Sequence, residues 1–450
     1  MKKLAALLLA LCLAISATAC SNADAPSSQA SSSPAAPSSS SEPAQESTSG
    51  KEPATIRIYT HWGESYKHDG LEKLFDALEQ QQSDYVYEAT HLSGDTLVER
   101  VMMEITSGEA PDIISGRASD RTEFIDAGYM YEMDDAPWVK DWDENLLKCD
   151  TYNGHLYGLP YDVEVGGIWY NMNVLDQYGL KVPTTKSEFI AMCDTLVKNG
   201  VTPIAFGAAE SDPCQYTMSY FVNAILYNNG TFDANKALLE NTGSVKDIPA
   251  YQEALTNAYE MFIPYLNEND LGITRETAYE QFLAGERAMT IQGNFVVGVF
   301  READPNCNVA FGPIPQSDNA KENLVGTTSD NDLMVLKGGN TDGAMAFINF
   351  MASDEGRDIW AKTTGNLSAS SAEVASGVDP MNLSAYEWVK NGQIYMRGDL
   401  VTLSGNVNSE WQSLTQKFIV EGYAANKSGT SADAYVAQFL DDADVRFSAL

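Results

Sequence analysis

From residue 53 onwards the chain alternates short apolar runs with helical patterns, and this order constrains the fold more than any other feature. Residues 55–59 alternate apolar and polar side chains as a half-buried strand does, and apolar residues at helical spacing follow them. A second strand over 85–87, a second helix through 97–105 and a short buried strand at 111–114 complete a β-α-β-α-β order. This order predicts the doubly wound α/β class.

The rest of the chain continues the alternation and then becomes mostly helical. No internal repeat and no second linker interrupts it, so two lobes are expected to pack together without a flexible joint in sequence. The expected elements are a helix over 187–199, a strand over 203–206, helices near 215–228 and 250–266, and helical segments near 342–352, 384–396, 407–421 and 431–443.

The first twenty residues have the features of an export signal. Lys2 and Lys3 precede an apolar run over 4–15, which is too short to span a bilayer of ~30 Å, and small residues follow it. The sequence Ala-Thr-Ala-Cys that ends at Cys20 resembles a bacterial lipobox, although Leu is commonest at its first position. We therefore expect lipidation at Cys20; the alternative is cleavage near this point with Cys20 incidental.

A linker follows the signal, over residues 21–52. Residues 21–50 contain 12 Ser, 6 Ala and 4 Pro, a composition that cannot form a packed core. Thirty such residues have an r.m.s. reach of roughly 30 Å. This length suits a tether that holds a folded domain away from a membrane, which is the main reason to prefer lipidation.

The net charge of −35 excludes some partners and the cysteines exclude some chemistry. Nucleic-acid binding and adhesion to anionic lipid both need an excess of Lys and Arg, so neither is expected. The Cys and His spacings fit no zinc or redox motif, and no cofactor fingerprint is present. One disulfide could form outside the cell, and the sequence does not pair its four candidates, Cys149, Cys193, Cys214 and Cys307.

Several segments, in this order, resemble the extracellular solute-binding proteins of ABC sugar importers, the family that includes maltose-binding protein. Each motif alone is weak, and their order makes the resemblance specific over roughly 55–370. The segments are TIRIYTHWGE at 55–64, GEAPDII at 108–114, NGHLYGLPYDVEVGGIWYN at 153–171, PTTKSEF at 183–189, FLAGERAM at 282–289 with Gly293, and FGPIP at 311–315.

The resemblance implies a type II periplasmic-binding-protein fold, in which two doubly wound lobes are joined by a three-segment hinge. Lobe one would comprise 53–161 and 328–370, and lobe two 162–327 and 371–450, with crossings near 160–164, 324–329 and 366–372. It implies a lipid-anchored receptor on the extracellular face of the cytoplasmic membrane. This receptor would bind a carbohydrate by lobe closure and deliver it to the permease subunits of an ABC transporter.

Two pairs of candidate ligand-binding residues follow predicted strands, because ligands of open α/β sheets bind beyond the carboxyl ends of strands. Trp62 and Glu64 follow the first strand, and an indole with a carboxylate suits the apolar face and the hydroxyls of a sugar. The alternative is a core Trp beside a solvated Glu. Asp120 and Arg121 follow the strand at 111–115 in a turn where the family places polar sugar contacts. The alternative for this pair is a carboxylate at a helix start and a surface Arg.

Asp162 and Glu164 stand two apart on an extended segment, so they share one face at a separation of about 7 Å. By resemblance, this segment crosses between the lobes and Glu164 aligns with a sugar-contacting carboxylate. Two carboxylates at such a distance could also suit a glycoside hydrolase. Trp169 and Tyr170, further along, are expected in the core.

The last candidates rest on the resemblance. Asn294 and Phe295 correspond to a turn in which the family stacks a Trp on the ligand, and here Phe replaces it. Arg397 stands at the predicted end of a helix and is either a ligand contact or a solvent-facing Arg.

Other functions stay open at this point. A glycoside hydrolase would use Asp162 and Glu164, but a receptor needs the same hydrogen-bond acceptors and no catalytic motif supports hydrolysis, so we expect no enzyme activity. The acidic candidates also allow a non-sugar solute such as a polyamine or a peptide. A metal set of His61, Glu64 and His68 has no standard zinc spacing, and we expect no metal.

Overall fold

The computed structural model describes residues 52–450 except 232, 372–373, 397–402 and 404. The predicted export signal with Cys20, residues 21–51 of the predicted linker over 21–52, and Arg397 lie outside the described residues. A first sheet has five strands in the order β2 (Tyr85–His91), β1 (Ala54–Thr60), β3 (Ile113–Ser115), β12 (Leu333–Val335) and β6 (Gly158–Leu159). β1 is parallel to β2 and to β3, whereas β12 is antiparallel to β3 and to β6.

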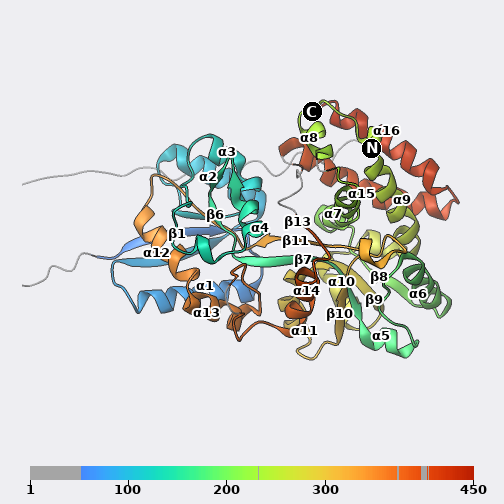
Figure 1. Cartoon of the computed structure of the whole chain (residues 1–450), viewed down its shortest axis with the longest axis horizontal. Coiled ribbons are helices and arrows are strands. Elements are labelled where there is room, and N and C mark those ends of the chain that lie inside the picture. The colour runs from blue at the N-terminus through green and yellow to red at the C-terminus, as the bar shows by residue number, and fades with distance from the viewer. Residues whose placement is uncertain (1–51, 232, 372–373, 397–402, 404) are drawn as a thin grey trace, which may run out of the picture. The chain divides into compact units, whose positions relative to one another are not determined.

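Helices α1 (Ser65–Glu79) and α2 (Gly94–Ser107) join the three parallel strands and cover opposite faces of the sheet (Figure 1). The cause is the alternation within β1. Ile58 is fully buried in one apolar cluster with Leu71 of α1, and the adjacent Tyr59 lies in another cluster with Leu97 of α2. The predicted β-α-β-α-β order is therefore confirmed.

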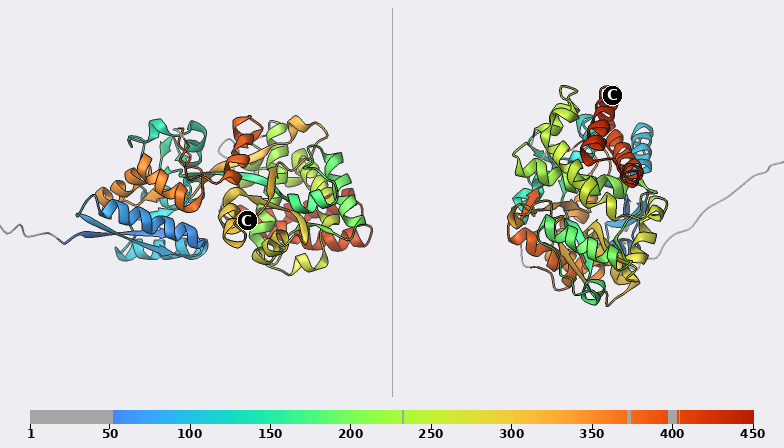
Figure 2. Two further views of the ribbon diagram at one scale, coloured as in Figure 1. Left: turned by 90° about the horizontal axis from the view of Figure 1, so that it is seen from below. Right: turned by 90° about the vertical axis from the view of Figure 1, so that its right-hand side faces the viewer.

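A segment distant in sequence completes the α1 face. Helices α12 (Thr341–Met351) and α13 (Asp354–Thr364) both contact α1, as Figures 1 and 2 show. The approach is close, because a Cβ placed on Gly70 would lie 2.8 Å from the ring of Trp360. The sequence predicted a helix only over 342–352. α13 begins separately because Ser353 caps it, with its hydroxyl accepting from the backbone N–H of Gly356 at 3.1 Å.

A second sheet has the strand order β13 (Ile394–Met396), β11 (Val325–Asp330), β7 (Asp162–Asn171), β9 (Arg287–Gly293) and β8 (Thr202–Ala205), and β10 (Val309–Gly312) also pairs with β7. Ile168 and Tyr170 of β7 are buried in its core, and Trp169 is buried on the other side, as expected. The longer helices that contribute to this core are α6 (Lys186–Lys198), α7 (Ser211–Asn228), α9 (Pro249–Met261), α15 (Gly405–Lys427) and α16 (Ala432–Phe447).

One helix expectation is wrong at its end. The helix predicted over 384–396 is α14 (Pro380–Lys390), which starts earlier and ends six residues before 396. Gly392 adopts a φ of 71°, a left-handed conformation that ends the helix and lets β13 pair with β11. The expected helices near 342–352, 407–421 and 431–443 are present as α12, α15 and α16.

Shorter elements are α3 (Thr122–Asp126), α4 (Glu144–Leu147), β4 (Thr151–Tyr152), β5 (His155–Leu156), α5 (Met172–Gln177), α8 (Ala234–Leu239), α10 (Arg275–Leu283), α11 (Val297–Ala303) and the 3₁₀ turns η1 (Ala118–Asp120) and η7 (Asn294–Val296).

Three segments from distant parts of the chain lie side by side at the junction between the two sheets. Asp162, the first residue of β7, pairs with Asp330 at the end of β11 and forms a bridge with Ser368. The backbone N–H of Val163 donates to the carbonyl of Leu367 at 2.8 Å. These are the segments in which the sequence predicts crossings. The exact lobe boundaries stay a prediction.

No helix within the described ranges is both long enough and apolar enough to span a bilayer.

Candidate functional site

A cleft of about 1200 Å³ is lined by residues from both sheets and their helices. One side comes from the segment after β1 and from η1 and α3, which follow β3. The other side comes from α7, α10, η7 and the neighbouring strand β7. Part of the cleft thus lies at the carboxyl ends of β1 and β3, as the rule for open α/β sheets predicts.

Six of the residues predicted from the sequence line this cleft. They are Trp62, Glu64, Asp120, Arg121, Glu164 and Phe295. They come from four separate segments of the chain, which only the folded structure brings together. Asp162 and Asn294 do not line it, and both are buried.

Arg117 connects the carboxylates on both sides of the cleft, and sequence analysis missed it. Its guanidinium lies 3.2 Å from Asp120 and 3.3 Å from Glu164. Its Nε donates to the carbonyl of Ser329 at 2.9 Å and lies 3.5 Å from the carboxylate of Asp332. Burial lowers the pKa of Arg117, but the surrounding carboxylates outweigh burial and hold that pKa well above its ordinary value. The signal was available, because Arg117 stands only two residues after the end of β3.

Lys67 plays a similar part for a second pair of carboxylates. Its ammonium is buried, 3.4 Å from Glu64 and 3.7 Å from Asp330. Burial lowers the pKa of Lys67, yet Asp330 and the other neighbours raise it above its ordinary value overall. Glu64 and Asp330 are therefore compensated within the protein. The spacing of three between Glu64, which precedes α1, and Lys67 in its first turn could have indicated this pair.

Glu164 is held between Arg117 and an aromatic helix face. The hydroxyl of Tyr220 donates to its carboxylate at 3.3 Å. Tyr216, one helical turn earlier on α7, meets the ring of Phe295 edge-on, with centroids 6.1 Å apart and an interplanar angle of 74°. Sequence analysis missed both tyrosines. The spacing of four places Tyr216 and Tyr220 on one face of α7, which was the available signal.

The side chain of Trp62 is almost wholly buried, which leaves little of its ring accessible to a ligand. Only 2% of it is exposed, and its ring packs on Trp360 with centroids 5.7 Å apart. Its indole N–H is buried and has no hydrogen-bond partner among the described residues. The core interpretation therefore describes most of this side chain, although the residue also lines the cleft.

Asp162 differs from the prediction that paired it with Glu164 as a ligand contact. Its carboxylate accepts hydrogen bonds from Trp360 Nε1 at 3.0 Å, Asn331 Nδ2 at 2.6 Å and Asn366 Nδ2 at 2.7 Å. Residues of two distant segments thus cover it, namely Asn331 after β11 and Trp360 with Asn366 in and just after α13, and it stabilises the junction of the sheets. Burial raises the pKa of Asp162 to about 7, although these three donors lower it.

Asn294 also differs from its predicted role. Its Oδ1 accepts from the backbone N–H of Val165 at 2.8 Å, and its Nδ2 donates to the carbonyl of Val163 at 3.1 Å and to Asn382 at 2.9 Å. Its amide ties η7 to β7 and α14. Only its neighbour Phe295 reaches the cleft.

Two groups of histidine and acidic side chains bear on metal binding. His61 and His68, which the sequence analysis did not expect to bind a metal, make separate contacts: His61 Nδ1 contacts Ser115 Oγ at 2.6 Å, whereas His68 Nε2 contacts the carbonyl of Trp62 at 2.8 Å. Burial, followed by the charge of Arg121, lowers the pKa of His61 to about 4.

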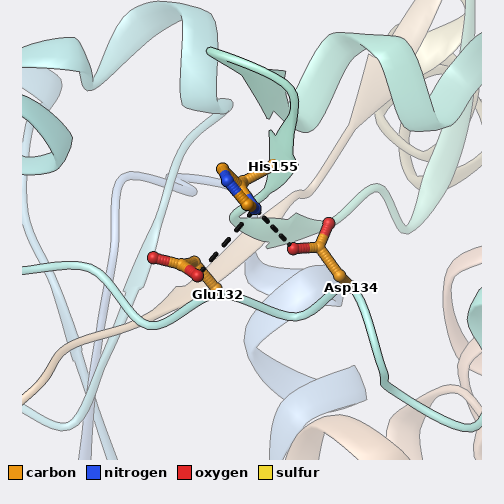
Figure 3. A group of neighbouring side chains, drawn as sticks. All are labelled: Glu132, Asp134 and His155. Carbon is orange, nitrogen blue, oxygen red and sulfur yellow. Dashed lines mark hydrogen bonds and ion pairs between the residues drawn. The ribbon is translucent and has the colours of Figure 1, made fainter.

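A different group, Glu132, Asp134 and His155, lies on the surface (Figure 3). His155 Nδ1 is 2.8 Å from Asp134 and 3.9 Å from Glu132, and Lys337 lies 3.8 Å from Glu132. All three side chains are exposed and an ammonium already faces one of the carboxylates. This geometry describes a surface ion-pair cluster.

A sequence profile of the family described as bacterial extracellular solute-binding protein matches residues 64–358. The chain belongs to this family. Among curated relatives of this solute-binding protein, an uncharacterised ABC transporter extracellular-binding protein of Pyrococcus horikoshii is 24% identical over 356 residues, which cover 76% of this chain and 78% of the relative. The melibiose/raffinose/stachyose-binding protein MelE of Bacillus subtilis is 22% identical over 60% of this chain and 64% of its own length.

Solved structures give the same fold for this solute-binding protein. The structure of a sugar transporter protein of Bacillus licheniformis in complex with stachyose superposes with a TM-score of 0.67 at 18% identity, covering 88% of this chain and 100% of that one. The architecture is thus that of type II periplasmic solute-binding proteins, as the resemblance implied.

Proposed function

We propose that this solute-binding protein is an extracellular receptor that binds an oligosaccharide in the cleft and delivers it to an ABC transporter. The observation that carries the proposal is the position of Glu164. Its carboxylate is held by Arg117 and Tyr220 beside the ring of Phe295. A fixed, charge-compensated acceptor next to an aromatic ring suits hydroxyl groups on one side of a sugar and C–H groups on the other.

The size of the cleft supports a ligand of more than one sugar ring. Its volume of about 1200 Å³ exceeds the ~300–1000 Å³ typical of pockets for drug-sized molecules. Two relatives bind such ligands according to their names, namely MelE with melibiose, raffinose and stachyose, and the Bacillus licheniformis protein with stachyose. The comparisons do not favour a polyamine or a peptide.

The test is calorimetry of the full chain with raffinose and stachyose. We expect the unmodified protein to bind at least one of them, and Glu164→Gln to bind it at least about tenfold more weakly, because a neutral amide with one acceptor oxygen replaces a charged carboxylate with two. Glu280→Gln is the matched control, since Glu280 is exposed and lies outside the cleft lining. A folded Glu164→Gln variant with unchanged affinity, or no binding by the unmodified protein, contradicts the proposal.

We also propose that the protein has no hydrolase activity. Asp162 is enclosed by three donors and cannot act with Glu164 on a bond in the cleft. Stachyose has no reducing end. Incubation of the protein with stachyose should therefore produce no new reducing ends. New reducing ends that disappear in Asp162→Asn would overturn this view.

Sugar binding is proposed to close two lobes, 53–161 with 328–370 and 162–327 with 371–450, about the three crossing segments. A ligand that contacts both lobes only when they are closed shifts the population towards that form. X-ray scattering with and without the sugar tests this, since closure lowers the radius of gyration.

Attachment to the outer face of the membrane through lipid at Cys20 is proposed from the signal and the linker. Cys20→Ser should move the protein from the membrane fraction to the medium. Retention of this variant in the membrane fraction would contradict the anchor.

A further inference from the structure

Three glycines lie side by side on one face of the second sheet. Gly166 of β7 pairs with Gly326 of β11 on one side and with Gly293 of β9 on the other. Residues directly opposite in neighbouring strands point to the same face, so the three positions form a row without side chains. At ~4.8 Å between strands, the row is about 10 Å wide.

This row faces the cleft. Glu164 precedes Gly166 by two residues on the same strand, so the two share a face, and Glu164 lines the cleft. Gly326 itself is also a lining residue.

An aromatic side chain occupies the space above each glycine. A Cβ on Gly293 would lie 2.5 Å from the ring of Phe295, and one on Gly326 would lie 2.5 Å from the hydroxyl of Tyr395. A Cβ on Gly166 would lie 2.6 Å from the hydroxyl of Tyr220 and would also collide with its ring. These separations are shorter than real Cβ contacts allow. The three rings come from η7, β13 and α7, so the row gathers them from distant segments.

The accessible rings are those of Tyr220 and Phe295, which are half-buried and line the cleft. Tyr395 also lines the cleft but is only 3% exposed. Tyr220 reaches the carboxylate of Glu164 with its hydroxyl at 3.3 Å. The position of the ring above Gly166 therefore also sets this hydrogen bond.

We infer that the glycine row, Gly166, Gly293 and Gly326, determines how the cleft recognises a sugar, by letting the rings of Tyr220 and Phe295 lie against the sheet as an aromatic floor beside Glu164. A side chain at Gly166 or Gly293 pushes a ring into the cleft and away from this arrangement. The glycines are positioning residues, and the inference rests on the proposed sugar binding. The two rings pack against the C–H face of the sugar, and Glu164 accepts hydrogen bonds from its hydroxyl groups.

The test compares alanine variants of the row with a glycine of the same sheet that has room for a Cβ. A Cβ on Gly312 of β10 would have its nearest neighbour at 3.6 Å, an ordinary contact, so Gly312→Ala is the control. Calorimetry with raffinose and stachyose should show affinity about tenfold lower for Gly166→Ala and for Gly293→Ala, and unchanged for Gly312→Ala. Unchanged affinity in the folded row variants overturns the inference.

A second set of variants separates recognition from a general loss of stability. Tyr220→Ala removes the ring that a Cβ at Gly166 would meet. Adding Gly166→Ala to it should lower the urea midpoint less than Gly166→Ala does alone, and should reduce sugar affinity no further. Equal additional losses in both backgrounds overturn the inference. If Gly166→Ala alone does not fold, a folded double variant supports the inference and an unfolded double variant overturns it. Absence of sugar binding by the unmodified protein refutes the proposed function, and with it this inference, whereas normal binding by Gly166→Ala and Tyr220→Ala refutes the inference alone.

Discussion

Replacing Asp162 by Asn should make the stability of the protein less dependent on pH. The carboxyl group is 2% exposed and sits where β7, β11 and the segment at 366–368 meet. Burial raises its pKa from 3.8 to about 7 despite hydrogen bonds from Trp360, Asn331 and Asn366. Asn has nearly the same shape and does not titrate.

The sign and size follow from the two pKa values. Between the ordinary pKa and about 7 the folded protein keeps a proton that the unfolded chain has lost, so the free energy of unfolding falls as pH rises through this window. Within this window, each pH unit changes the free energy of unfolding by about 1.4 kcal/mol. From pH 5 to pH 8 the contribution of Asp162 should fall by roughly 3 kcal/mol, because the fall ends near the folded pKa. Below the ordinary pKa the contribution is fully present.

The assay is urea unfolding of the unmodified protein and of Asp162→Asn at pH 5 and pH 8. Burial raises the pKa of the neighbouring Asp330, but Lys67 and Arg117 outweigh burial and hold it below its ordinary value, so Asp330 stays charged from pH 5 to pH 8. Carboxyl groups elsewhere titrate in both proteins and cancel in the difference. We expect Asp162→Asn to gain roughly 3 kcal/mol relative to the unmodified protein between the two pH values. A difference that is the same at pH 5 and pH 8 would refute the reasoning and would mean that the three donors keep Asp162 charged in the folded state.

Two further predictions concern other charged groups. Arg117→Ala should lower the free energy of unfolding by about 3 kcal/mol, because it removes the guanidinium that lies against the buried carboxylate of Asp332 and against those of Glu164 and Asp120. Lys236→Ala, which breaks an exposed i,i+4 pair with Glu240, should cost at most about 0.5 kcal/mol in the same urea titration, and equal losses would contradict the role given to Arg117. The hydrogen bond that His155 donates to Asp134 raises the pKa of His155 above its ordinary 6.5, so NMR titration should show that pKa falling in Asp134→Asn, and no change would contradict the ion pair.

The site was predictable from the sequence where its residues follow the carboxyl ends of strands, because ligands of open α/β sheets bind there. Trp62, Glu64, Asp120 and Arg121 follow β1 and β3, and all four line the cleft. The same rule should also have indicated Arg117, which was missed. Arg117 lies closer to the end of β3 than Asp120 and Arg121 do, and it contacts several carboxylates of the cleft. Lys67, Tyr216 and Tyr220 stand on helices, where a polar face looks like any solvent-exposed face until a partner is placed opposite it.

Local sequence alone determined the alternating strands and helices of the first sheet, because periodicity and turn residues act between near neighbours in the chain. Only the tertiary structure decided between Asp162 and Glu164, which share one face of β7 and look equivalent in sequence. Trp360, Asn331 and Asn366 arrive from distant segments to cover Asp162, whereas Arg117 and Tyr220 hold Glu164 at the cleft. The row of Gly166, Gly293 and Gly326 depends in the same way on strand register between residues more than a hundred positions apart, which no local pattern encodes.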